Sequence, residues 1–484
     1  MRTRSPAGRG FIIQGDLTMR SSRFFHVLAV LFAAVGVYVL LPDGDSVAGQ
    51  DKVQKKKKEK KVAVPLDFPP KLPDGATVHT VTSDEFIKAP ATIEKGVLIA
   101  KTAPTVDFLY YPGQTYKASI WSNWGDGLAV NGKYYSSIGD HNAPKGNAFV
   151  YEYDPAKKAL RILCDVVSVI RDMLLYLPGK IHGRLDMGKD GFLYFSTHRG
   201  GTKVTSDANK YQGDWILKCD PKSGKAEVVA HGPVPKHCIP TSVLDPERMI
   251  FYGGTAPGND VPDGVKFFAY DVVNKKLLYS CPDGPPRYMI LANSTGRVYY
   301  VPGSDGNFGP MMRYDPAKPS DAPVKIGAQL GLRAATQETK DGMVYTCSKG
   351  SKTGRTMIYS FNTKTEEAKE LGQAAVGTQE YITSIDVDAT GRYVYYVPAA
   401  HGHAENDGSP VVQFDTKTKT RKVIAFLHPY FSDKIKAIPT GTFSTAIDPA
   451  GDKLYITWNV KRGTAAWDCC ALTVIHIPEA ERRP

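Results

Sequence analysis

The sequence lacks the short motifs that would fix a cofactor or a reaction. It has no Cys-x-x-Cys-His for covalent haem attachment, no glycine-rich phosphate-binding loop and no Gly-x-Ser-x-Gly turn to present a nucleophilic serine. Function therefore has to be inferred from residues that the fold brings together.

Cysteine is scarce, and none stands directly after the apolar run near the N-terminus, which excludes a lipoprotein anchor. Arg20 and Arg23 precede that run, Phe24–Leu41, and small residues at 46–49 suit a signal peptidase. We expect residues 1–49 to be a signal peptide and the mature protein to be periplasmic or extracellular, without stable membrane insertion. An uncleaved anchor is the alternative, because the run is nearly long enough to span a bilayer.

The positive charge is concentrated at one end of the chain. The net charge is +12, but residues 1–61 hold twelve Lys or Arg against five Asp or Glu. Such a tail does not indicate a specific nucleic-acid partner. Residues 50–95 include a lysine tract at 52–61 and a proline-rich stretch at 65–73, which predict a flexible linker. Residues 96–484 are then the folded domain.

One short pattern recurs along that domain: a turn pair followed by an aromatic and β-branched strand. Its six copies are Asn131–Tyr135, Asp190–Thr197, Thr295–Val301, Asp341–Thr346, Thr390–Val397 and Gly451–Thr457. A seventh copy, Asp245–Tyr252, keeps the strand without the glycine.

A second strand follows each copy, and most of these end in an Asp or Asn that favours a turn. They are Phe149–Pro155, Ile216–Pro221, Phe267–Asp271, Met312–Pro316, Ile358–Asn362, Val411–Asp415 and Leu472–Ile477. Successive Asp or Asn markers lie 44 to 66 residues apart. The fold class is therefore predicted as all-β, a seven-bladed β-propeller with four-stranded antiparallel blades. Residues 106–111 should complete the last blade, because no outer strand can follow residue 477.

These blade strands resemble those of YVTN-type and streptogramin-lyase-like propellers, which carry a similar Gly-x-x-Leu/Val-Tyr-Val/Ile-Thr segment. The resemblance spans most of residues 115–478, and the long histidine-bearing loops resemble those of exported bacterial propellers. It implies the fold and says little about activity.

Propeller geometry indicates where a site should lie, because inner strands begin and second strands end on one face. The histidines at such positions are His141, His182, His198, His401 and His403. We expect His182 and His198 to lie close together as catalytic acid or base groups. The five histidines together are candidate ligands of a divalent transition metal. The alternative is that they are loop histidines bonded to backbone.

Arginines and tryptophans occur at the same level. Arg184, Arg199, Arg287 and Arg333 would favour an anionic ligand, or would pair with carboxylates of adjoining blades. Trp124 and Trp458 would stack on a flat ligand, or would plug the channel.

Seven cysteines in an exported chain can form disulfides. Adjacent Cys469 and Cys470 can form either a strained pair or two ordinary thiols.

Two function classes follow from these features. The first is a propeller that binds an anionic small molecule or saccharide in its central funnel, as a metal-assisted lyase or hydrolase. The second is a non-catalytic scaffold for a protein or cell-wall partner.

Overall fold

The computed structural model describes residues 66–482, apart from 119, 144, 171–174, 304–305, 350–353 and 464–466. The chain divides into a unit of residues 1–61 and a unit of residues 62–484, and all described residues belong to the second. The predicted signal peptide and the linker up to residue 65 lie outside the described residues.

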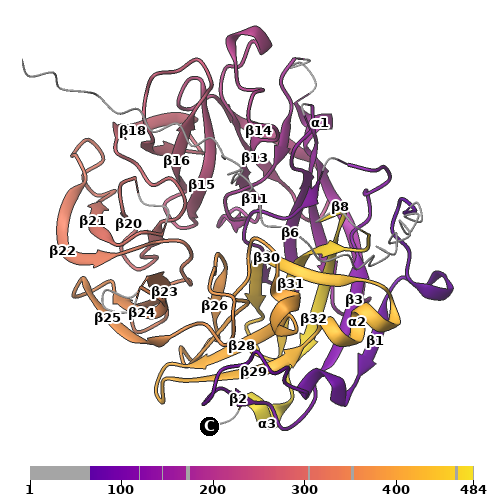
Figure 1. The fold of residues 1–484 in the computed structure, drawn as a ribbon. Coiled ribbons are helices and arrows are strands. Elements are labelled where there is room, and N and C mark those ends of the chain that lie inside the picture. The colour runs from indigo at the N-terminus through magenta and orange to yellow at the C-terminus, as the bar shows by residue number, and fades with distance from the viewer. Residues whose placement is uncertain are drawn as a thin grey trace, which may run out of the picture. The chain divides into compact units, whose positions relative to one another are not determined.

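Seven antiparallel sheets are arranged as the blades of a β-propeller (Figure 1), which confirms the predicted fold class. Blade 1 contains β4 (Trp121–Ser122), β5 (Leu128–Val130), β6 (Lys133–Asp140), β7 (Ala148–Asp154) and β8 (Ala159–Asp165). Blade 2 contains β10 (Asp186–Met187), β11 (Leu193–Ser196), β13 (Trp215–Cys219) and β14 (Ala226–His231). A separate ribbon pairs β9 (Pro178–Lys180) with β12 (His198–Arg199).

The next blades follow the same order from centre to rim. Blade 3 contains β15 (His237–Asp245), β16 (Ile250–Pro257), β17 (Lys266–Asp271) and β18 (Lys276–Pro282). Blade 4 contains β19 (Ile290–Leu291), β20 (Val298–Tyr300), β21 (Gly309–Tyr314) and β22 (Val324–Leu330). Blade 5 contains β23 (Met343–Lys349), β24 (Thr356–Asn362) and β25 (Glu367–Gln373), with a single bridge between Ala335 and Thr346 on its inner side. In the ranges that the structure describes, blades 2, 3 and 4 therefore have four strands each, and blade 5 has three.

The last two blades use N-terminal strands as well. Blade 6 contains β26 (Ile385–Val387), β27 (Tyr393–Tyr396), β28 (Pro410–Asp415) and β29 (Thr420–Phe426), with β2 (Leu98–Ile99) parallel to β29. Blade 7 contains β30 (Ile438–Ile447), β31 (Lys453–Lys461), β32 (Cys469–His476), β3 (Thr105–Tyr110) and β1 (His79–Thr82). The pairing of β3 with β32 confirms that residues 106–111 complete this blade and close the ring.

Helices are few among the described residues. They are α1 (Val166–Val169), α2 (His428–Lys434) and α3 (Glu479–Arg482), with 3₁₀ turns η1 (Pro73–Gly75), η2 (Asp84–Ile87), η3 (Asp207–Asn209) and η4 (Ala404–Asp407). Within the described part of the chain, none of these helices is long and apolar enough to cross a membrane.

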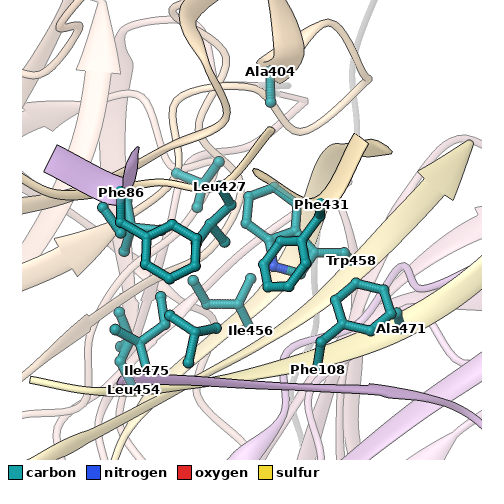
Figure 2. Close-up of a cluster of buried hydrophobic side chains, with 14 of the residues drawn as sticks. Phe86, Phe108, Ala404, Leu427, Phe431, Leu454, Ile456, Trp458, Ala471 and Ile475 are labelled. Carbon is teal, nitrogen blue, oxygen red and sulfur yellow. The ribbon is translucent and has the colours of Figure 1, made fainter. Parts of the chain in front are cut away.

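Part of the segment expected to be linker is folded onto the propeller. Strand β1 extends the sheet of blade 7, and Phe86 of η2 is buried beside Leu427 and Phe431 (Figure 2). Glu94 accepts hydrogen bonds from Arg355 and Arg421 at 2.8 and 2.9 Å. This difference from the sequence expectation arises because the few apolar residues here find a partner surface that composition does not reveal.

Hydrophobic clusters fill the space between neighbouring blades, as the apolar middle strands require. Cys469 belongs to the cluster shared with blade 6, whereas Cys470 belongs to the cluster shared with blade 1. Consecutive strand residues point to opposite faces, so the two thiols face away from each other. Both are free and buried, as are most of the other cysteines.

Candidate functional site

The indole of Trp124 is the centre of an aromatic and imidazole cluster at the face where inner strands begin. Trp124 lies between β4 and β5, and its half-buried ring meets residues from blades 1, 2, 6 and 7. The ring centroids near it are those of His141 (4.5 Å), His182 (5.4 Å), His401 (5.7 Å), Phe443 (4.3 Å) and Trp467 (5.8 Å). Ring closure thus brings together residues that are far apart in sequence.

His182 and His198 form a buried pair beside this cluster. Their ring centroids are 5.3 Å apart in an edge-on arrangement. The short hairpin of β10 and β11 positions them, because Asp186 pairs with Tyr194 and the two histidines flank those strands. Burial lowers the pKa of both imidazoles well below 6.5, and neighbouring cations lower it further. Both rings are therefore neutral near pH 7.

Lys180 is a member of the site that the sequence reasoning missed. Its ammonium lies 3.0 Å from Nδ1 of His141 and 4.8 Å from the centroid of Trp124. Burial lowers the pKa of Lys180 to about 7, with further contributions from Arg199 and Arg287. The available signal was its place two residues before His182, since alternate residues of an extended segment share a face.

Two of the predicted arginines approach the same space. Arg287 and Arg333 line a small cavity together with His182, Trp124 and Phe443. Its free volume of about 20 Å³ suits a water or a similarly small polar group. The guanidinium of Arg333 also lies 5.1 Å from the ring centroid of Tyr381, so its orientation is supported from the side.

The other two arginines face carboxylates. Arg184 donates to Asp186 at 2.9 Å and lies near Asp126. Burial raises the pKa of Asp214 to about 6, and the positive charge of the nearby Arg199, in β12, offsets part of that rise. Arg184 is therefore the less suitable of the four for holding an external anion.

The opposite end of the channel has a different character. A cavity of about 260 Å³ there is lined by Asp126, Asp386 and turn residues of several blades. Burial raises the pKa of Asp126 to about 6 and that of Asp386 to about 7. The hydroxyl of Tyr288 donates to Asp126 at 3.0 Å. Asp126, Arg184 and Tyr288 also line the small cavity beside Trp124, so a carboxylate and a guanidinium lie between the two cavities.

Two predicted residues lie away from the centre of the cluster. His403 is exposed and stands just before η4 with a positive φ of 71°. Trp458 is 0% exposed and packs with Phe431 and Ala471 in the core (Figure 2), where its indole donates to Thr473 at 2.8 Å. Its assignment to ligand binding is corrected here: β31 continues to Lys461, so Trp458 lies inside a strand and not at its open end. Trp467 approaches Trp124 instead.

One set of three potential metal ligands lies close together in the part of the chain that the structure describes. It comprises His198, Asp214 and Cys238, all buried. Of the five histidines predicted as ligands, it includes only His198. Asp214 and Cys238 were not predicted, because Asp214 precedes the third strand of blade 2 and Cys238 belongs to blade 3, and no local pattern shows that they meet His198.

Comparisons with known proteins find similarity in fold only. No family model matches the sequence, and no curated protein is significantly similar to it. The β-propeller domain of the Trilobed protease from Pyrococcus furiosus is 11% identical, with a TM-score of 0.45 over 74% of this chain and 94% of that one. An oligogalacturonate lyase from Vibrio parahaemolyticus is 11% identical, with a TM-score of 0.45 over 84% and 98%. Hydrazine synthase from Kuenenia stuttgartiensis is 13% identical, with a TM-score of 0.46 over 76% and 99%.

Proposed function

We propose that the face around Trp124 binds an anionic small molecule, and that an acidic saccharide is the ligand class that suits it best. The observation that carries the proposal is the sign of the charges that act on His182, the imidazole that lines the small cavity. The charged groups that act most strongly on His182 are Lys180, Arg287 and Arg333, all of them cationic. Such a cluster is costly in a low-dielectric site, and a bound anion would relieve the repulsion.

The aromatic lining supports a saccharide in particular. Trp124 is half-buried, and His401 next to it is exposed, so a ligand can reach this surface. Flat rings offer apolar faces to the C–H groups of a sugar, while arginine matches a carboxylate through two parallel hydrogen bonds. The small cavity beneath admits only a compact polar group, so most of the ligand would lie above it.

As an enzyme, this site would suit a lyase better than a hydrolase. Lys180, with a pKa of about 7, is matched to accept the proton from the carbon beside a carboxylate. An arginine would hold that carboxylate while a carbon–oxygen bond breaks, the leaving oxygen takes a proton and a carbon–carbon double bond forms. His182 and His198 are weaker bases than we expected from the sequence, because their pKa values are so low. Metal assistance by the five histidines stays a prediction.

Calorimetry with a short galacturonate oligomer and its neutral galactose counterpart tests the proposal. The protein should bind the acidic oligomer and bind the neutral one at least roughly tenfold more weakly, since one charge-assisted pair is worth about 1.5–3 kcal/mol. Arg287→Gln should lose most of this preference. Arg297→Gln is the matched control, because Arg297 pairs with Asp315 at the opposite end of blade 4.

Equal affinity for the charged and neutral oligomers, or equal weakening by both arginine substitutions, would contradict the anion site. Absence of any saturable binding by an acidic ligand would favour the scaffold function, in which the propeller face contacts a protein or cell-wall partner.

A further inference from the structure

Three side chains with different donor atoms meet between blades 2 and 3. His198 belongs to β12, Asp214 directly precedes β13, and Cys238 is the second residue of β15. One imidazole nitrogen, one carboxylate oxygen and the thiol sulfur all lie within 4.8 Å of one another. The three residues are separated in sequence and meet only because the two blades pack together.

Burial makes this group unusual. His198 is 5% exposed, and Asp214 and Cys238 are 0% exposed. Nδ1 of His198 and Oδ2 of Asp214 are buried without a hydrogen-bond partner. Leaving a buried polar atom unpaired costs about 1–3 kcal/mol, so two such atoms on residues of one cluster point to a partner that they share.

The surroundings hold Asp214 as a metal ligand is usually held. Its other oxygen, Oδ1, accepts hydrogen bonds from the hydroxyls of Tyr176 at 2.7 Å and Thr197 at 3.1 Å. The backbone N–H of Asp214 donates to the carbonyl of His237 at 3.0 Å, which ties the residue to the strand that carries Cys238. One oxygen is thus fixed while the other is left free, as in sites where hydrogen bonds orient a ligating carboxylate.

We propose that His198, Asp214 and Cys238 bind a zinc ion, with the fourth position of a tetrahedral site open to water or another small ligand. Nitrogen, oxygen and sulfur donors together suit the borderline-soft Zn²⁺ better than Mg²⁺ or Ca²⁺, which prefer oxygen alone. Donor atoms that share a tetrahedral zinc lie roughly 3.5 Å apart. Small side-chain rotations are therefore enough to close the site.

The local charge is compatible with a divalent cation. The positive charges of Arg199 and Lys180 lie near this group and, taken alone, would repel a metal ion. The carboxylate and the thiolate together carry two negative charges, which balance Zn²⁺. Binding displaces the thiol proton of Cys238 to solvent and changes no oxidation state. The ion would stabilise the contact between blades 2 and 3, whether or not the Trp124 surface binds a saccharide.

Metal content and cobalt spectroscopy of the chelator-treated full chain test this site. After incubation with zinc sulfate and desalting, the wild type should retain stoichiometric zinc. Cys238→Ser and Asp214→Asn should lower the zinc affinity by roughly a hundredfold or more. Co²⁺ should give the wild type a thiolate-to-cobalt charge-transfer band that zinc abolishes and that Cys238→Ser lacks.

Matched controls are available in the same region. Cys219→Ser removes a buried thiol from β13. His237→Asn removes the imidazole next to Cys238 in sequence, and Nδ1 of that imidazole already has a hydrogen-bond partner in Thr255 at 2.8 Å. Both should retain zinc. A wild type that retains no zinc and shows no charge-transfer band would overturn the proposal, as would wild-type zinc binding by Cys238→Ser. Should a variant fail to fold, the wild-type cobalt spectrum still decides. Saccharide binding by the chelated protein is a separate measurement, so either proposal can fail alone.

Discussion

Some single residues in this propeller lower its stability in a way that the fold alone does not explain. Lys180 is the clearest example. Burial lowers the pKa of its amino group to about 7, and the nearby Arg199 and Arg287 contribute to this shift. An unfolded lysine has a pKa near 10.4. A residue kept at such a cost is a candidate for function, because functional sites are where destabilising arrangements persist.

Replacing Lys180 should therefore stabilise the protein and weaken ligand binding. Below pH 7 the lysine is charged in both states, and the cost of burying that charge is fully present. Between about pH 7 and 10 only the unfolded state binds the proton, so stability rises with pH and the cost disappears above that range. Lys180→Met should raise the melting temperature most near neutral pH, with a difference from wild type that shrinks toward pH 10. Melting curves across this range provide the measurement.

The exposed Lys222 of blade 2 supplies the control for that comparison. Lys222→Met should leave the melting temperature nearly unchanged at every pH. A Lys180→Met protein that melts below the wild type at pH 7 would show that the lysine is mainly structural.

The sequence placed His141, His182, His198 and His401 on one face because strand ends in a propeller converge. It could not locate Asp214 or Cys238, since their proximity depends on how two blades pack and not on any local pattern. For Lys180 the only local signal was its place two residues before His182. Trp458 shows that sequence reasoning can also assign a core residue to the site. A strand that runs a few residues longer than expected moves a tryptophan from the open end into the core.

At the scale of elements, both ends of the described chain fasten the rim of the propeller. Glu481 of α3 is buried and accepts hydrogen bonds from the backbone N–H groups of Lys101 and Thr102 at 2.7 and 3.0 Å. Its other oxygen meets the ammonium of Lys422 at 2.9 Å. Burial would raise the pKa of Glu481, but these donors lower it. A short terminal helix thus joins β29 to the segment that leads into β3.

Removing this carboxylate should loosen the rim. Glu481→Ala leaves two backbone N–H groups without their acceptor and leaves the Lys422 ammonium only the backbone carbonyl of residue 481. We expect a loss of about 2–4 kcal/mol in the free energy of unfolding. Urea unfolding followed by tryptophan fluorescence measures it. The exposed Glu479 on the same helix offers a matched control. An equal loss of stability in Glu479→Ala would contradict the role of the Glu481 carboxylate in fastening α3 to the rim.

For the whole molecule, the repeated turn-and-strand pattern was sufficient to predict seven blades and the N-terminal strand that closes the ring. It was not sufficient for β1 and η2, since a four-residue strand and one buried Phe86 are too short to stand out beside a lysine- and proline-rich stretch. Nor did it reveal that blade 5 has only a single bridge at Ala335 on its inner side.

Ring closure also predicts how the propeller responds to acid. Asp107 of β3 is buried and bonds to His476 of β32 at 2.8 Å and to Lys158 of blade 1 at 2.7 Å. Thr80 of β1 donates to it as well, at 2.5 Å. Burial alone would raise the pKa of Asp107, but the hydrogen bonds lower it to about 2. One carboxylate therefore joins the first strands, the last strand and the neighbouring blade.

Because the pKa of Asp107 is lower in the folded state than in the unfolded state, its stabilisation is complete above about pH 4. It is lost as the pH falls toward 2. Lowering the pKa of this carboxyl from 3.8 to about 2 corresponds to about 2 kcal/mol. Asp107→Asn should lower the free energy of unfolding by about that amount or more at pH 7, and by progressively less as the pH approaches 2. Urea midpoints between pH 2 and 7 measure the convergence. Asp220→Asn, in an exposed turn of blade 2, should show no comparable loss. If the urea midpoints of wild type and Asp107→Asn changed in parallel with pH, the contact of β3 with β32 and blade 1 would depend on packing and not on this charge.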